Sequence, residues 1–496
     1  MFVIFVALTI SVLIYHYLRW NYDYWKARGV PYEKPVVYFG NFKESMMRKR
    51  HVSEDFSQFY YKFKGTANFC GIFQMREPRI MIINPSLVNE ILINKFHHFK
   101  DNEFSKIFNP KVDPLFKRNP FLARGDTWIE YRSEIATAFS SQRMRSMFPI
   151  MELICEKMYI QIISHIKHPF EARELALRYT ADIVGNCIFN IETDCLSGDC
   201  DIRNMSKRLS SPPMRTIFFM IFTEIFPAFR SHLPFKFIAS DVETFFLNFF
   251  ERSMRRRKQN RLQLNDFLDY VISLRERKRL SHEDVAGHLT TFFSDGLETT
   301  SLLLAHTLYE LANNESVQNK LRGEIERYVE LYDEISYEIL NEMSYLELVI
   351  NETLRLHPPF TLISKECTSD IEVELREGQK YLIQKGMNIY IPLYQLQTDP
   401  EYFPKPKEFI PERCAKAFSS KGFYLPFGNG ARQCLGMKFA SITCKAAVVE
   451  LVRNFKISIN NRTNENLVID PNEFLNIKKG GLWLDFRPVH MFKICG

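Results

Sequence analysis

The chain has 496 residues, of which 46% are hydrophobic and 25% are charged, so it is long enough for one large core or for two domains. Its 44 phenylalanines raise the aromatic share to 14%. The net charge of +7 is modest, and no segment combines basic runs with aromatic residues as single-strand binders do. These features argue against a nucleic-acid partner and favour a large apolar core or pocket.

Residues 1–19 are predicted to form a membrane anchor. No charged side chain precedes Arg19, and a helix over Phe2–Leu18 would span about 25 Å, just enough to cross a bilayer. Positive residues follow directly, which by the positive-inside rule leaves the rest of the chain in the cytosol. A buried core helix is the alternative. We then expect a linker with Pro and Gly at 20–39 and a globular part at 40–496.

The ten cysteines are scattered along the chain, and we expect reduced thiols. The closest pair, Cys195 and Cys200, lacks the spacing of a zinc ribbon and is expected to be two loop cysteines. Helical patterns predominate from Asp126 to Glu352, and short strands with Pro- and Gly-rich loops follow. The predicted fold class is therefore mainly α with a smaller β part (α+β).

One long helix is expected from Ser281, which forms a capping box with Asp284, to about Ala312. Its centre, residues 294–300, reads Ser-Asp-Gly-Leu-Glu-Thr-Thr and interrupts an otherwise apolar pattern. A glycine within a helix costs about 1 kcal/mol relative to alanine, so a packing or ligand reason is expected. A kink with solvated polar side chains is the alternative.

The strongest chemical signal lies at residues 427–436, with the sequence Phe-Gly-Asn-Gly-Ala-Arg-Gln-Cys-Leu-Gly. The glycines allow a tight loop close to a flat ligand, and amides of the helix that follows can stabilise the thiolate of Cys434. Arg432 is placed to pair with an anionic group. Gln433 stands where a dinucleotide-binding loop needs its third glycine, and a single cysteine without a second ligand argues against zinc.

This stretch resembles F-x-x-G-x-R-x-C-x-G, the haem-binding loop of the cytochrome P-450 family of haem-thiolate monooxygenases. The resemblance implies a b-type haem (iron protoporphyrin IX) with Cys434 as its iron ligand. It also implies a triangular helical body in which the haem is buried between the long helix and the helix that follows Cys434. Phe427, Gly428, Arg432 and Gly436 would contact the haem.

Other segments match the family in the same order. Glu352 and Arg355 match its E-x-x-R helix, and Arg413 lies in Pro-Glu-Arg, which resembles the element whose arginine joins that pair. Trp128 and Arg132 match W-x-x-x-R, whose side chains hydrogen-bond a haem propionate. Residues 24–31, 399–400 and 479–481 look like insect microsomal members.

The centre of the long helix resembles the oxygen-binding segment of the family. Thr299 would hold dioxygen and water, and Glu298 would connect it to a proton supply. Four positions depart from the usual pattern: Asp295 replaces Ala or Gly, Lys365 replaces an arginine that meets a propionate, Gln397 replaces histidine and Cys414 replaces an aromatic residue.

The resemblance implies a monooxygenase that inserts one oxygen atom from O2 into a lipophilic small molecule at the endoplasmic reticulum membrane. No flavin or nicotinamide fingerprint occurs, so electrons must come from a separate protein. The resemblance implies that this protein is NADPH–cytochrome P-450 reductase, with cytochrome b5 as a second candidate donor. Two alternatives remain open, a reductase-independent haem-thiolate isomerase or dehydratase and a haem protein that binds ligands without turnover. The basic residues suggested for the reductase contact are Arg132, Arg143, Lys421 and Lys438.

The segment Met214–Phe237 is unusually apolar for a connection, with seven phenylalanines and with breaks at Pro227 and Pro234. In the family this region roofs the pocket and dips into the bilayer, whereas core packing is the other interpretation. The basic run Arg255–Lys258 suggests either an anionic lipid contact or, with better support, a solvated helix face.

Overall fold

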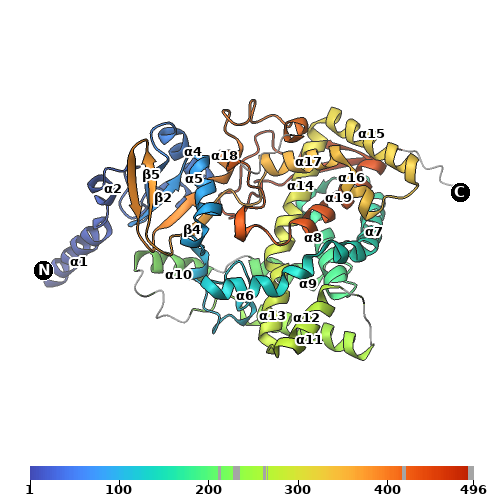
Figure 1. The fold of residues 1–496 in the computed structure, drawn as a ribbon, viewed down its shortest axis with the longest axis horizontal. Helices are drawn as coiled ribbons and strands as arrows, with labels where there is room; N and C mark the ends of the chain where they lie inside the picture. Colours follow the sequence, from blue (N-terminus) through green and yellow to red (C-terminus); the bar gives the residue numbers. More distant parts are fainter. Residues whose placement is uncertain are drawn as a thin grey trace.

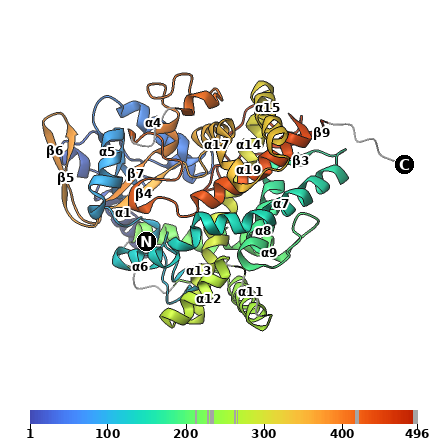
Figure 2. The same cartoon turned by 45° about the vertical axis from the view of Figure 1, so that its right-hand side comes forward.

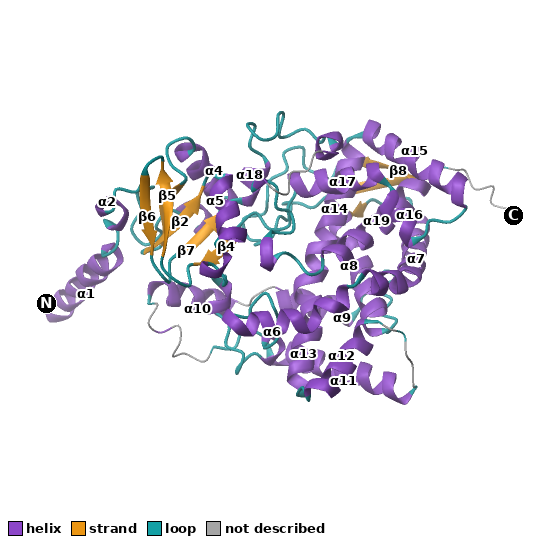
Figure 3. Cartoon of the chain, viewed as in Figure 1, coloured by secondary structure: helices purple, strands orange, loops and turns teal. Residues whose placement is uncertain are grey.

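The computed structural model describes residues 1–489 except 211–213, 227–228, 230–234, 261–263, 265 and 416–420. Pro227, Pro234 and Cys495, which entered the sequence predictions, therefore lie outside the described residues. Helices form most of the molecule, and small sheets lie mainly at one side (Figures 1 and 3). The predicted class, mainly α with a smaller β part, is confirmed.

The α-helices are α1 (Phe2–Arg19), α2 (Tyr24–Ala27), α3 (Lys43–Met46), α4 (Val52–Phe63), α5 (Pro85–Asn89), α6 (Gly125–Ala136), α7 (Ser141–Ser164), α8 (Ala172–Ile183), α9 (Asp201–Ser210), α10 (Met214–Ile225), α11 (Ser240–Gln259), α12 (Phe267–Lys278), α13 (His282–Thr291), α14 (Leu297–Asn313), α15 (Glu315–Tyr332), α16 (Tyr337–Glu342), α17 (Ser344–Leu356), α18 (Leu393–Gln397) and α19 (Met437–Asn454). The strands are β1 (Phe69–Gln74), β2 (Glu77–Ile82), β3 (Phe170–Glu171), β4 (Ile363–Glu366), β5 (Ile371–Arg376), β6 (Gln379–Ile383), β7 (Asn388–Ile391), β8 (Phe455–Ile459) and β9 (Trp483–Pro488).

The largest sheet joins segments that are far apart in the sequence. Its order is β1-β2-β7-β4, in which β2 pairs with β7 in parallel and the other pairs are antiparallel. Trp25 is fully buried against this sheet and its indole N–H donates to the carbonyl of Ile72 at 3.1 Å. The compact part of the molecule thus begins within residues 20–39, earlier than the sequence indicates.

The helical body is built around α14, whose residues are almost all buried and which packs against α8, α17 and α19 (Figure 2). The long helix predicted from Ser281 is present, and the capping box between Ser281 and Asp284 has both of its hydrogen bonds. A π-helical turn at Phe292–Gly296 separates α13 from α14, so the interruption predicted at the helix centre is a widened turn. Such turns often occur at functional sites.

Helix α1 projects from the sheet side of the molecule, and nearly all of it is exposed (Figure 1). It is the one described helix that is long and apolar enough to cross a membrane. Near its end, Tyr17 stacks on Phe226 at 5.6 Å and donates a hydrogen bond to the carbonyl of Ile225. Helix α10 therefore lies beside the base of α1, and several of its apolar side chains are exposed, including Phe218 and Phe222.

Two sequence interpretations change. Cys195 and Cys200 form a disulfide with their Cα atoms 5.1 Å apart, so the expectation of reduced thiols is wrong for this pair. The loop between them is short, and the Asp182 carboxylate accepts hydrogen bonds from the N–H groups of Cys195 and Leu196, which holds one end of it. In the basic run, Arg257 is buried and pairs with Asp266 and Asp269, so it does not belong to a solvated face.

Candidate active site

The cysteine loop is shaped by close contact with the segment after β2. Gly430 adopts a positive φ of 68°, and a Cβ there would lie 2.1 Å from the carbonyl oxygen of Leu92, so only glycine fits. The N–H of Cys434 donates to the carbonyl of Phe427 at 2.9 Å, which closes the loop. This closure places the thiol directly before α19.

The Cys434 thiol faces an internal space. Its side chain is accessible to solvent, yet burial is the main cause that raises the pKa of this thiol. The backbone N–H groups of Gly436 and Met437, at the start of α19, oppose that rise, and so does Arg132, whereas Asp295 adds to it. The amides predicted to stabilise a thiolate are therefore in place.

Three cations and an indole surround one end of the site. The Arg432 guanidinium lies 4.1 Å from the Trp128 ring centroid and donates to the carbonyls of Lys100, Pro120 and Ala123. Arg132 donates to the carbonyl of Gln433 at 2.6 Å. Lys365 comes from β4, far away in the sequence, and lies 5.3 Å from the Phe96 ring, which itself packs on Trp128.

These cations are held at an electrostatic cost. Burial, together with the nearby Arg432, lowers the pKa of Lys365 to about 7, and burial lowers the pKa of Arg432 to about 9 although Asp101 opposes the shift. Burial also lowers the pKa of Arg132. The Trp128 indole N–H is buried without a hydrogen-bond partner among the described residues. The positive charges of the cluster are thus not fully balanced by negative charge, and the Trp128 N–H lacks a hydrogen-bond acceptor.

On the opposite wall, α14 presents Thr299, whose hydroxyl donates to the carbonyl of Asp295 at 2.7 Å, one helical turn earlier. Glu298 is buried and both of its oxygens accept from Arg173 on α8, at 2.9 and 3.1 Å. The sequence pattern did not indicate Arg173, because it lies 125 residues away and carries no motif.

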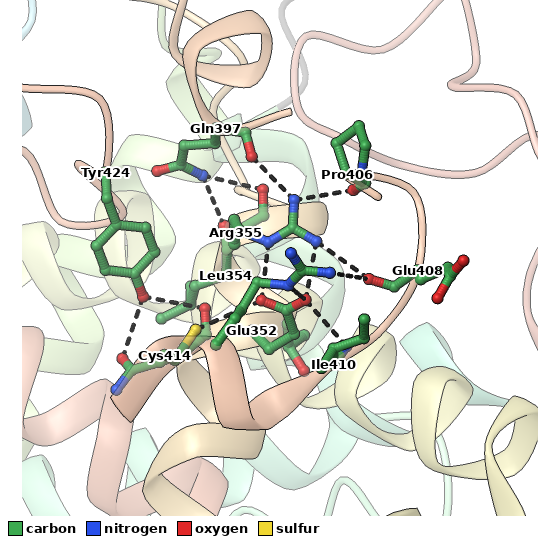
Figure 4. A network of polar contacts seen from close by, with 12 residues as sticks. Glu352, Leu354, Arg355, Gln397, Pro406, Glu408, Ile410, Cys414 and Tyr424 are labelled. Atoms are coloured by element: carbon green, nitrogen blue, oxygen red, sulfur yellow. Dashed lines mark hydrogen bonds and ion pairs between the residues drawn. The ribbon is translucent and has the colours of Figure 1, made fainter. Parts of the chain in front are cut away.

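Glu352 is the centre of a buried polar network (Figure 4). Its carboxylate accepts two hydrogen bonds from Arg355 at 2.8 Å and one from Arg413 at 2.9 Å. The Cys414 thiol also donates to it, at 3.4 Å. The three residues of the expected charge cluster therefore lie together, and Cys414 contributes a polar contact that an aromatic ring would lack.

Gln397 links this network to the loop that leads toward Phe427. Its amide donates to the carbonyls of Leu354 and Arg355 (Figure 4). Its oxygen accepts from the N–H of Leu425 at 3.0 Å. Glutamine has both a donor and an acceptor, so it can bridge helix α17 and the loop at once. Its presence instead of histidine leaves this connection intact.

The residues around Cys434 fit a haem. A haem needs a thiolate ligand, two anionic propionates near cations, and a flat space between two walls. Here a loop thiol faces an internal space, three cations with lowered pKa values and an unpaired indole N–H lie at one end, and a Cβ added to Gly296 or Gly428 would meet nothing within 4 Å. The same donor set suits neither zinc nor a dinucleotide.

Comparison with known proteins identifies the protein family of this chain. The cytochrome P450 family model matches residues 30–484, and the chain belongs to this family. It is a P450 monooxygenase whose cofactor is haem b.

Similar proteins come from insects. Probable cytochrome P450 28a5 of Drosophila melanogaster is 33% identical over 491 residues, which cover 96% of this chain and 97% of that protein. Probable cytochrome P450 28d1 of the same species is 34% identical over 496 residues, covering 97% and 98%. Cytochrome P450 6A1 of Musca domestica is 29% identical over 507 residues, covering 98% of each chain.

Proposed function

We propose that this enzyme is anchored in the endoplasmic reticulum membrane, faces the cytosol, and oxygenates lipophilic small molecules with electrons from NADPH–cytochrome P-450 reductase. The observation that carries the proposal is the Cys434 thiol, which faces an internal space between the cation cluster and the polar turn of α14. Haem, when bound, supplies the reduction of O2 and the transfer of one oxygen atom.

The residues of the chain have separate tasks in this proposal. Cys434 is the iron ligand, and the N–H groups at the start of α19 favour its thiolate. Arg432, Arg132 and Lys365 offset the propionate charges, and the Trp128 N–H gains its missing acceptor. Phe427, Gly428 and Gly436 shape the loop against the ring. Glu352, Arg355 and Arg413 hold that loop in position.

Thr299 and Glu298 manage protons on the oxygen side. The Thr299 hydroxyl can turn from the Asp295 carbonyl to donate to a ligand in the site, because a hydroxyl rotates freely. Glu298 connects Thr299 to a proton supply, and its two carboxylate oxygens accept hydrogen bonds from Arg173. The Arg173 side chain is partly exposed to solvent, so the ion pair connects the buried Glu298 to the surface of the molecule.

The reductase would approach the face that carries the cysteine loop. Lys421 and Lys438 are exposed and are available to an acidic partner, either the reductase or cytochrome b5. Arg132 and Arg143 contribute less than the sequence suggests, because Arg132 is half-buried against Gln433 and Arg143 donates to the carbonyl of Asp266. Helix α1 supplies the anchor.

The test is reconstitution of the full-length protein with the reductase, NADPH and O2 over a panel of neutral lipophiles. We expect NADPH-dependent oxygenated products and a ferrous carbonyl complex with the red-shifted Soret band of thiolate ligation. Cys434→Ser should lose both. Cys367→Ser is the matched control, since a serine hydroxyl keeps the hydrogen bond to the Ser369 carbonyl. Turnover of hydroperoxides without NADPH, or ligand binding without turnover, would contradict the proposal.

A further inference from the structure

Asp295 places a carboxylate in the π-helical turn opposite Cys434. Its side chain is partly accessible to solvent, yet burial is the main cause that raises its pKa to about 6. A side chain that is accessible but far from the outer surface faces an internal space, and we place Asp295 at this space. It also acts electrostatically on Cys434, where it raises the pKa of the thiol. The carboxylate therefore borders the same space as the thiol, one turn before Thr299.

The carboxylate is held by neutral donors. Asn119 donates to its two oxygens at 3.2 and 2.9 Å, and the Ser294 hydroxyl donates at 2.6 Å. The Asn119 oxygen accepts from the N–H of Phe121 at 2.7 Å, which fixes the amide so that its NH2 group faces Asp295. Both partners thus favour the ionised, accepting form of the carboxylate.

No cation compensates this charge within the described part of the chain, where Asp295 forms no ion pair. Glu298, three residues later, is paired with Arg173. Glu134 also pairs with Arg118 and Lys278. A buried carboxylate with only neutral partners carries an unmet negative charge, which a ligand with a positive charge would offset.

Aromatic surface continues from the Asn119 loop. The rings of Phe121, Phe104, Phe474 and Phe360 pack in a row. Their centroids lie 6.3 Å apart for Phe121 and Phe104, 5.3 Å for Phe104 and Phe474, and 5.8 Å for Phe474 and Phe360. Phe121 and Phe474 are exposed. An ammonium ion with an apolar or aromatic body fits this combination, because the rings accept the body and attract the charge as well.

We propose that Asp295, oriented by Asn119 and Ser294, is a specificity-determining residue that selects lipophilic ammonium compounds as substrates. This inference rests on the proposed oxygenase function, because only an oxygenase would turn these compounds over as substrates. Their binding, however, can be measured without reductase or NADPH. The attraction between a carboxylate and a cation in a partly buried site is strong enough to give about tenfold or more in affinity, even without a hydrogen bond.

The experiment compares two ligands of equal shape on the ferric holoenzyme. One is a phenylbutyl chain that ends in trimethylammonium, which carries a permanent charge and has no lone pair for iron. The other ends in a neutral tert-butyl group. Calorimetric and spectral titrations should show that wild type prefers the ammonium ligand by about tenfold or more. Asp295→Asn should abolish the preference while the neutral ligand binds as before.

Asp199→Asn is the matched control, because it removes one negative charge from a side chain that is 81% exposed. It should keep the preference. An equal affinity of wild type for both ligands would overturn the inference even if Asp295→Asn did not fold. Equal weakening of both ligands by Asp295→Asn would also overturn it and would indicate a structural role. Neutral lipophiles that bind but give no NADPH-dependent product would refute the oxygenase function and leave the selectivity result standing.

Discussion

Several side chains near Cys434 are buried cations that lack enough negative charge from the polypeptide to balance them. Lys365 is the clearest case, since it is buried beside Arg432 with a pKa lowered to about 7. A lysine loses its charge more easily in such a place than an arginine would. In the proposed haem site, the replacement of the usual arginine by Lys365 would make the propionate end sensitive to pH.

Lys365→Met should release haem about tenfold faster than wild type, because a charged hydrogen-bond partner of a propionate is lost. Pairing with a propionate raises the Lys365 pKa above its value of about 7, so this contribution is complete below pH 7 and is lost as pH rises through the raised pKa. Transfer of haem to excess apomyoglobin measures the rate. Lys380→Met, at a side chain that is 75% exposed, is the control, and a difference that grows with pH would contradict the assignment.

Among the buried ion pairs of the described residues, two join helices or loops near the cysteine loop and the oxygen-side turn. Glu298 and Arg173 connect α14 to α8, and Glu352 connects α17 to the loop that carries Arg413. A buried carboxylate shared by two arginines stabilises only as a complete set, because removal of the carboxylate leaves two cations without their partner. The pair of Glu352 with Arg413 holds the segment before the cysteine loop against helix α17.

Glu352→Gln should destabilise the holoenzyme by about 3–5 kcal/mol, since Arg355 and Arg413 both lose their counterion. Thermal unfolding followed by circular dichroism, together with haem loss, measures the effect. Glu251→Gln is the control, because it breaks an exposed pair with Arg255 that is worth about 1 kcal/mol or less. Similar changes in the two variants would show that the network adds no special stability.

The whole molecule has apolar surface on one side. Helix α1 projects there, and α10 lies beside its base with exposed phenylalanines (Figure 1). In the proposed membrane-bound form, α1 crosses the bilayer, α10 lies at its surface and the cysteine loop faces water. The contact between Tyr17 and Phe226 would then limit the tilt of the body on the membrane.

Removal of residues 1–19 should weaken, but not abolish, binding to liposomes in a flotation assay. Adding Phe218→Ser and Phe222→Ser to that deletion should lower the partition coefficient at least about tenfold further, because full burial of a phenylalanine contributes about 1.5–3 kcal/mol and these side chains are 66% and 39% exposed. Leu331→Ser on α15, a 67% exposed apolar side chain at the far side from α1, is the control. Complete loss of binding on deletion alone would contradict a role for α10.

The sequence by itself determined the class and predicted the cofactor loop and the oxygen-side turn, because each of these patterns depends on residues that lie close to one another in the chain. Cys434, Thr299 and the pair Glu352 and Arg355 are of this kind. Their meaning follows from local spacing: a glycine loop before a helix, a polar interruption in an apolar helix, and two charges on one helix face.

Only the tertiary structure decided which distant groups meet. The pairing of β2 with β7, the ion pair of Glu298 with Arg173 and the orientation of Asp295 by Asn119 join segments that carry no shared pattern. The disulfide of Cys195 and Cys200 likewise depends on the loop conformation. Such contacts arise because packing of the core brings segments together, and local spacing contains no information about that packing.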